Sequence, residues 1–312
     1  MANLQLIKKL RGATGCGIAD CNKAIKECGE ESYEDCIAWL RKKGLSKAAK
    51  KSGRITSEGL IGIYSKDNKT SIVEVNSETD FVAKNDKFQN FVKEVVKASI
   101  DVPSTVFGDE YIEQLKNLDL KSGQKISELL AENIGVIGEN LNLRRGNTIE
   151  LSSEGKIVSY LHNSVGEGLG KIGVLVALKS SADKTKLEEL GKKIAMHIAA
   201  TKPEFLNIKD VDQAKLDKER EILFEQARVS GKPDDIIEKM MVGRIRKYYE
   251  QVVLLEQFFV MDDKKKISAV LEEFAKETGT PIEIQEYSLF ILGEGIEKEV
   301  NNFAEEVASM SK

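Results

Sequence analysis

Cysteine and histidine, two residue types that often carry chemistry, are scarce in this chain and poorly spaced for catalysis or metal binding. The four cysteines, Cys16, Cys21, Cys28 and Cys36, contain no Cys-x-x-Cys pair of the kind that binds zinc. Cys21 and Cys28 instead recur with Ile25 at the i, i+4, i+7 spacing of one helix face. We therefore interpret the cysteines as small core residues in a reducing compartment rather than as metal ligands.

The two histidines and a glycine-rich segment give no enzyme signature either. His162 and His197 are not accompanied by a Ser-His-Asp or Cys-His signature. The segment "GEGLGK" at residues 166–171 lacks the Lys-Ser/Thr ending of a phosphate-binding loop and lies between two predicted strands, so we interpret it as a flexible hairpin turn. The shortage of catalytic motifs favours a binding protein over an enzyme.

The stretch "EVNSETDFVAKNDKF", residues 74–88, places an acid and a large aromatic side by side where a predicted strand gives way to a helix. One interpretation is structural: Asp80 caps the helix and Phe81 packs against it as a hydrophobic staple. The other is functional: Phe81 is a rigid apolar anchor that inserts into a partner molecule. The residues alone leave both interpretations open.

Composition excludes several broad classes. The 312 residues carry a net charge of -4, so no global basic excess points to direct nucleic-acid binding. The basic segment "SKAAKKSGR" at residues 46–54 has no aromatic residue to stack a base, and we interpret it as a solvated linker. No run of about 18 apolar residues predicts a membrane span. The start, "MANLQLIKKL", lacks the apolar core of a signal peptide. We expect a cytoplasmic protein that does not bind membranes.

The elements that would position these residues begin with three short helices in residues 1–44. The first has Leu4, Ile7 and Leu10 on one face and is broken at "TGCG"; the second covers residues 18–28. The third begins near Tyr33 and is expected to end at Gly44. Such a unit closes a small core, and the linker described above would follow it.

A strand–strand–helix pattern then occurs twice. Residues 59–81 and 155–180 each contain two alternating apolar runs joined by a polar turn, and an amphipathic helix follows each of them. This pattern predicts an α+β fold with a duplicated antiparallel core. The predicted domains are residues 1–54, 55–140, 141–265 and 266–312.

A charged stretch inside the third predicted domain forms a further unit. Around residues 210–250, two helical patterns flank "SGKP", which predicts a helical hairpin that projects from the body. It is either a decoration of the core or a dimerisation arm, and the sequence favours neither. Residues 281–292 then predict strands, and residues 293–310 predict a final helix.

Several motifs in order closely resemble the bacterial elongation factor Ts family over nearly the whole chain: "LRGATGCGIADCNKAI", "TDFVAKN", "IGENLNLRR", "IAMHIAATKPEFL" and "QFFVM". The resemblance implies an N-terminal ubiquitin-associated-like three-helix module, the α+β core, a coiled-coil-like hairpin insertion and a C-terminal module. It implies a translation factor that binds elongation factor Tu, with GDP or without nucleotide, and promotes exchange of GDP for GTP. It implies no enzyme activity, no cofactor and no resident metal. An adaptor built on the N-terminal module, the competing class, would not need "TDFVAK".

The resemblance also assigns site residues. It implies that the motif Thr79, Asp80, Phe81 and Val82 disturbs the magnesium coordination of the partner. It implies partner contacts at Arg11, Ile18, Ala19, Ile137, Gly138, His162, Val260 and Met261. The family often has two bulky apolar residues where this chain has Ile18 and Ala19, so we expect a weaker contact there. The hairpin around residue 165 is also longer than expected.

Overall fold

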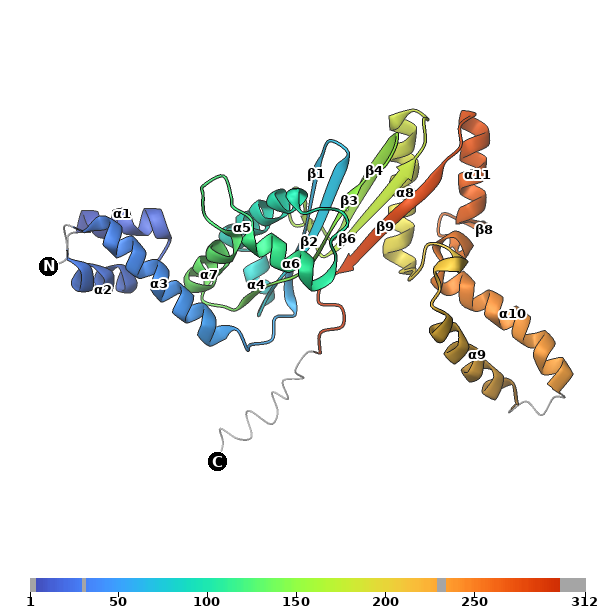
Figure 1. The fold of residues 1–312 in the computed structure, drawn as a ribbon, viewed down its shortest axis with the longest axis horizontal. Helices are drawn as coiled ribbons and strands as arrows, with labels where there is room; N and C mark the ends of the chain where they lie inside the picture. Colours follow the sequence, from blue (N-terminus) through green and yellow to red (C-terminus); the bar gives the residue numbers. More distant parts are fainter. Residues whose placement is uncertain (1–3, 30–31, 229–233, 298–312) are drawn as a thin grey trace.

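The computed structural model describes residues 4–29, 32–228 and 234–297 of the chain. The molecule is elongated, with a three-helix unit at one end, two antiparallel sheets with their helices in the middle and a pair of helices at the other end (Figure 1). The predicted mixed α+β class, with N-terminal helices and antiparallel sheets, is confirmed. Within the described residues, no helix is long and apolar enough to cross a membrane.

The N-terminal unit consists of α1 (Leu4–Thr14), α2 (Ile18–Cys28) and α3 (Tyr33–Lys51). Their apolar faces meet in a small core that contains Ile7, Leu10 and Ile25. Cys21 and Cys36 are buried in this core, whereas Cys16 and Cys28 are only partly buried, and all four cysteines are free thiols. Burial raises the pKa of the Cys21 and Cys36 thiols, which makes them poor nucleophiles.

The prediction that the third helix ends at Gly44 and gives way to a linker is wrong. α3 continues to Lys51, and Ala48 packs against the core of the first sheet. Gly44 lies at a close contact with α7 (Ile126–Ile137): a Cβ added at Gly135 of α7 would lie 3.2 Å from the Gly44 Cα. Glycine therefore permits a close approach of two helices here instead of ending one of them. A continuous helix joins the N-terminal unit to the core.

The first half of the core is a four-stranded sheet in the order β3-β2-β1-β5. Its strands are β1 (Glu58–Lys66), β2 (Lys69–Ser77), β3 (Leu141–Glu150) and β5 (Leu169–Gly170). One face of the sheet packs against α5 (Asp86–Ala98), α6 (Gly108–Asn117) and α7 through a cluster that includes Leu60, Phe88 and Tyr111. The short helices α4 (Asp80–Ala83) and η1 (Ser99–Asp101) flank α5. The strands predicted from alternating residues, β1 and β2, are thus buried on both faces, by these helices on one side and by the second sheet on the other.

The second half has the strand order β4-β6-β9. It contains β4 (Gly155–His162), β6 (Ile172–Lys179), β9 (Glu283–Ile291), α8 (Lys184–Thr201), α11 (Ile267–Thr278), η2 (Ile208–Asp210), η3 (Leu254–Glu256), β7 (Phe258–Phe259) and β8 (Asp262–Lys266). α8 covers the outer face of this sheet, and α11 contributes Ile267 and Leu271 to the same hydrophobic cluster. The inner face packs on the first sheet, where Ile61 and Ile72 meet Leu175 and Phe290.

The C-terminal segment is part of this second half. β9 pairs with β6, and Ile267 and Ile284 belong to the same hydrophobic cluster as α8. The predicted domain boundaries at residues 54, 140 and 265 stay predictions. Most of the predicted final helix, from residue 298 on, lies outside the described residues.

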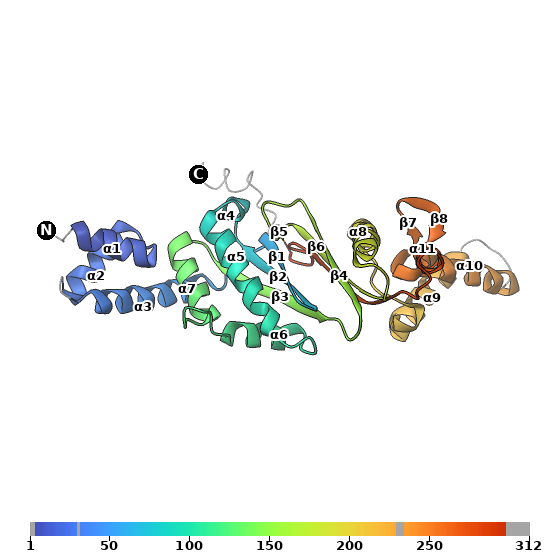
Figure 2. The ribbon, with the colours of Figure 1, turned by 90° about the horizontal axis from the view of Figure 1, so that it is seen from above.

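A helical pair, α9 (Gln213–Arg228) and α10 (Asp234–Val252), projects from the second half, as Figures 1 and 2 show. It occupies the stretch where the helical hairpin is predicted. The "SGKP" motif at residues 230–233, which predicts the end of one helix and the start of the next, lies outside the described part of the chain.

The loop between β4 and β6 is more than the flexible turn predicted for residues 166–171. Its residues Leu169 and Gly170 form β5 and pair with Gly62 and Ile61 of β1. The Leu169 side chain is fully buried in the core of the first half. A segment between two strands of the second half therefore joins the first sheet.

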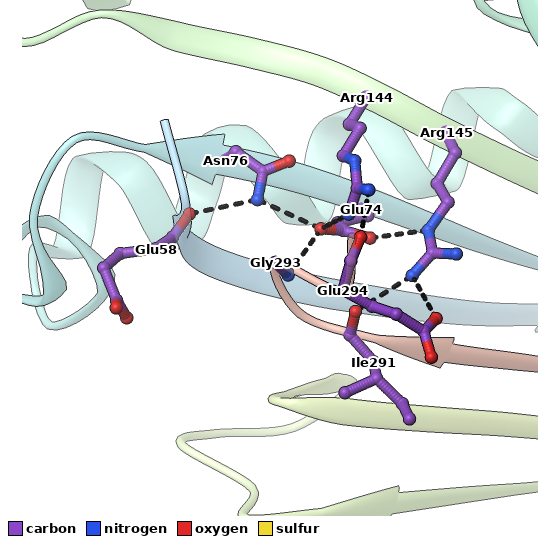
Figure 3. Close-up of polar contacts among 8 residues, drawn as sticks. All are labelled: Glu58, Glu74, Asn76, Arg144, Arg145, Ile291, Gly293 and Glu294. Atoms are coloured by element: carbon purple, nitrogen blue, oxygen red, sulfur yellow. Dashed lines mark hydrogen bonds and ion pairs between the residues drawn. The ribbon is translucent and has the colours of Figure 1, made fainter. Parts of the chain in front are cut away.

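A buried ion-pair network also joins the two halves (Figure 3). The Glu74 carboxylate on β2 is fully buried and accepts hydrogen bonds from Arg144 Nη1 at 2.9 Å, Arg145 Nε at 2.7 Å and the Gly293 N–H at 2.9 Å. Arg145 Nη2 in turn donates to the Ile291 carbonyl at the end of β9. Burial alone would raise the pKa of Glu74, but the Gly293 N–H and the two guanidinium groups outweigh it and lower that pKa.

Candidate functional site

The Asp80–Phe81 turn lies between β2 and α5 and divides its residues between core and solvent. Val82 and Ala83 are buried in the first core, whereas Asp80 is exposed and the Phe81 side chain is 76% exposed. An isolated exposed apolar residue is common. Here, however, the exposed aromatic lies in a one-turn helix whose next two residues are buried, so its backbone is fixed while its side chain is in solvent. The turn therefore presents a phenylalanine to an approaching molecule.

The structural interpretation, in which Asp80 caps the amphipathic helix and Phe81 staples it, is wrong. The N-cap of α5 is Asn85, whose side chain accepts a hydrogen bond from the Lys87 N–H at 2.9 Å. A staple must pack against its helix, and Phe81 is mostly exposed. The functional interpretation of Phe81 stays a prediction.

Polar contacts beneath the turn connect it to the end of α7. The Thr79 N–H and hydroxyl both donate to the Glu139 carboxylate, at 2.9 and 2.7 Å. α7 ends at Gly138, which adopts the left-handed conformation with φ 88°. The structure therefore places the predicted contact residues Ile137 and Gly138 directly before a residue that binds the turn. Sequence reasoning missed Glu139, because an acid after a helix-ending glycine carries no local signal of a partner 60 residues away in the chain.

The predicted N-terminal contact residues also share one location. Arg11 lies in the last turn of α1, and Ile18 and Ala19 begin α2; all three are exposed. The turn between the two helices faces the start of α5, where Lys87 Nζ lies 3.5 Å from the Gly15 carbonyl oxygen. This patch is therefore next to the helix that follows the Asp80–Phe81 turn.

The remaining predicted residues lie on the second half. His162 ends β4 and is exposed, with its Nδ1 3.0 Å from the Tyr160 hydroxyl. Val260 and Met261 are exposed at the hairpin between β7 and β8. Phe258 is exposed beside them, and sequence reasoning missed it, although "QFFVM" offers a second aromatic. The predicted residues therefore lie in separate patches along the molecule, and Figure 2 shows α4 and the β7–β8 hairpin on the same side of it.

A buried histidine supports the β7–β8 hairpin. His197 on α8 accepts the Val260 N–H at its Nδ1, 3.3 Å away, and its Nε2 lies 3.0 Å from the Gln257 side-chain oxygen. A backbone N–H can only donate, so Nδ1 is unprotonated and Nε2–H donates to Gln257. The neutral ring satisfies both contacts, and burial lowers the pKa of His197.

We expect this histidine to make stability depend on pH. Because its folded pKa lies below the unfolded value of 6.5, the unfolded chain takes up the proton first. The stability that neutral, buried His197 contributes is therefore fully present above pH 6.5 and is lost as the pH falls from 6.5 through the folded pKa. The slope in that window is about 1.4 kcal/mol per pH unit. Urea unfolding between pH 7.5 and 5 would measure it.

The control for that measurement is the other histidine, His162, which is exposed. His197→Gln should flatten the slope between pH 6.5 and 5, whereas His162→Gln should leave it as in the unaltered chain. Equal slopes for the unaltered chain and His197→Gln would contradict the assignment.

Comparisons with known proteins identify the family of this chain. The family model described as Elongation factor TS matches residues 78–294. The chain is 49% identical to elongation factor Ts of Rhodospirillum centenum, an alignment that covers 98% of this chain and 97% of that protein. It is 51% identical to elongation factor Ts of Rhodospirillum rubrum, with 98% and 97% covered. It is 50% identical to that of Paramagnetospirillum magneticum, with 98% and 96% covered. With the identity extending over nearly its whole length, the chain belongs to the elongation factor Ts family.

Proposed function

We propose that the Asp80–Phe81 turn is the part of this chain that loosens GDP from elongation factor Tu. As a member of its family, the chain is a nucleotide-exchange factor for elongation factor Tu, and it acts by binding rather than by catalysing a chemical step. The observation that carries the proposal is the 76% exposed Phe81 on a turn anchored by Val82 and Ala83. The action takes place in the cytoplasm, where translation elongation proceeds.

The physical basis is differential binding. Magnesium is a dominant positive charge in a nucleotide site and offsets the charge of the phosphates. An exchange factor releases GDP only if it binds the displaced conformation of its partner better than the loaded one. An aromatic side chain that fills a gap present only in that displaced conformation provides such a preference, and the adjacent Asp80 brings negative charge to the region where magnesium is held.

The other predicted contact residues would bind the partner away from its nucleotide site. Arg11, Ile18 and Ala19 form an exposed patch at the N-terminal end, and Val260 and Met261 form one on the second half. Two patches on either side of the turn would hold a large partner while Phe81 acts on its nucleotide site. The continuous α3 and the Glu74 network support this role, because they join the patches through helix and sheet.

Release of labelled GDP from purified elongation factor Tu tests the proposal. We expect the release rate to rise with the concentration of this chain and then to saturate. Because coupling is reciprocal, added GDP should weaken the binding of the chain to its partner. A release rate that does not change with the chain present would overturn the proposal.

We further propose that the helical pair α9–α10 is a self-association arm. A groove of about 1070 Å³ along the pair is lined by apolar side chains that include Phe224, Met241 and Ile245. Val242 lies at its edge with 74% of its side chain exposed. A second copy of the chain, with its own exposed Val242, is the occupant proposed for this surface, since apolar patches of this kind mark interaction sites.

Val242→Glu is expected to separate the copies. It places a charge on an exposed apolar position, so it should leave folding intact and reduce the solution mass from twice 34.6 kDa to 34.6 kDa. Light scattering over a range of concentrations measures the mass, and GDP release should stay unchanged. A single-chain mass for the unaltered protein at every concentration would contradict the arm proposal and leave the exchange proposal untouched.

A further inference from the structure

All three polar groups of Thr79, the residue before Asp80, form hydrogen bonds. Its N–H and hydroxyl donate to Glu139 Oε2 and Oε1, at 2.9 and 2.7 Å, and its carbonyl accepts from the Ser77 hydroxyl at 2.9 Å. Thr79 occupies the N-cap position of α4, but its side chain makes no capping hydrogen bond to that helix. Its hydroxyl contacts Glu139 instead. The two contacts to the carboxylate fix the direction in which the chain enters the turn.

The Glu139 side of this contact is fixed as well. Asn140, the next residue, donates its N–H to the Glu78 carboxylate and its side-chain amide to the Arg54 carbonyl at 2.9 Å. Glu78 and Glu139 therefore each accept from the backbone of the other's neighbour, in a reciprocal contact between residues 78–79 and 139–140. We call these four residues the turn clasp.

The clasp is also continuous with the N-terminal helices. Lys51, the last residue of α3, donates its ammonium group to the carbonyl of Gly138 at the end of α7. α3 and α7 approach closely at Gly44 and Gly135. The base of the turn is thus tied to α3, which packs against the helices α1 and α2 that carry the N-terminal patch.

From this geometry we propose that Glu139 is a positioning residue for exchange: it holds Phe81 in the orientation that meets the partner. The proposal rests on the proposed function of the turn. Hydrogen bonds to a carboxylate are roughly twice as strong as neutral ones, and two of them on one residue also fix its geometry. An exposed anchor contributes most when it is ordered before binding, because ordering it during binding consumes part of the interaction energy. Loss of Glu139 therefore weakens the action of Phe81 without removing Phe81.

Glu139→Ala is the first test, with Glu128→Ala as its matched control. Glu128 is exposed in the first turn of α7, at the opposite end of that helix from Glu139, and its substitution removes the same charge. At saturating exchange factor, we expect Glu139→Ala to slow GDP release by about ten-fold, which corresponds to about 1.4 kcal/mol. Glu128→Ala should release GDP at the rate of the unaltered chain. Equal rates for Glu139→Ala and Glu128→Ala would overturn the inference.

Thr79 offers a second, nearly isosteric pair. Thr79→Val removes the hydroxyl that donates to Glu139 but keeps the size of the side chain, whereas Thr79→Ser keeps the hydroxyl. We expect Thr79→Val to slow release several-fold more than Thr79→Ser does. The reverse order, with Ser slower than Val, would overturn the inference, because side-chain volume and not the hydrogen bond would then matter.

A double-mutant cycle separates positioning from a general loss of stability. If Glu139 acts through Phe81, Glu139→Ala should slow release by less than about two-fold when Phe81→Ala is already present. A purely structural role predicts the full loss in both backgrounds, in step with a lower melting temperature. If Phe81→Ala alone does not slow release, the proposed function of the turn fails. If Phe81→Ala slows release and Glu139→Ala does not, only the positioning role fails.

Discussion

Phe81→Ala is expected to slow the release of GDP from elongation factor Tu by more than ten-fold. Truncating an interface anchor of this kind typically costs about 2 kcal/mol or more, and each 1.4 kcal/mol is a factor of ten in rate. Because the anchor acts in the displaced conformation of the partner, the loss should appear mainly in the release rate and less in binding to the GDP-bound partner. Stopped-flow measurement of labelled GDP release, together with equilibrium binding, would separate the two.

The chain contains a suitable control for this variant. Phe107, which precedes α6, is also largely exposed, with 60% of its side chain accessible, and it is remote from the turn in sequence. Phe107→Ala should release GDP at the rate of the unaltered chain. Phe81 is exposed, so neither variant should lower the melting temperature appreciably. A Phe81→Ala protein that exchanges normally per folded molecule would show that the turn does not act on the nucleotide site.

Local pattern was sufficient to predict much of the fold. Alternating apolar residues predicted the hairpin of β1 and β2, and the 3.6-residue period predicted α5 and α8 after the two hairpins. These elements bury their apolar positions against a sheet, so periodicity and burial agree. The same reasoning failed at Gly44, because a glycine that ends a helix and one that admits a neighbouring helix look alike in a single sequence.

The contacts that organise the site were beyond local pattern. Glu139 binds Thr79 across 60 positions, and His197 accepts the Val260 N–H across 63. Nothing in the sequence distinguishes Glu74 from the many other carboxylates, although it is buried beside Arg145 and Gly293. Such pairings depend on how the two halves meet, which periodicity does not encode. The importance of Phe81 came from the family resemblance, and the residue assignments at the contact surface stay predictions.

The largest expected effect on stability comes from Arg145→Ala. This change removes the 2.7 Å hydrogen bond from Nε to Glu74 and the 2.9 Å bond from Nη2 to the Ile291 carbonyl. It leaves a fully buried carboxylate with one guanidinium partner instead of two. Breaking a buried pair by removing one partner costs about 3–5 kcal/mol. Because the Arg145 side chain is 29% exposed and Arg144 remains, we expect a loss of roughly 3 kcal/mol, near the lower end of that range.

The effect of Arg145→Ala should depend on pH in a direction set by Glu74. Its folded pKa is lowered from 4.5, so the stability contributed by the charged network is present above that value and is lost as the pH falls through the folded pKa. The difference in the free energy of unfolding between the unaltered chain and Arg145→Ala should therefore be large at pH 7 and shrink in acid, where protonated Glu74 no longer needs the guanidinium.

Lys192→Ala, the control, breaks an exposed pair with Glu188 and should change the free energy of unfolding by no more than about 1 kcal/mol. Urea unfolding of all three proteins at neutral and acidic pH tests this. A difference for Arg145→Ala as small as that for Lys192→Ala at pH 7 would mean that the network does not hold the two halves together.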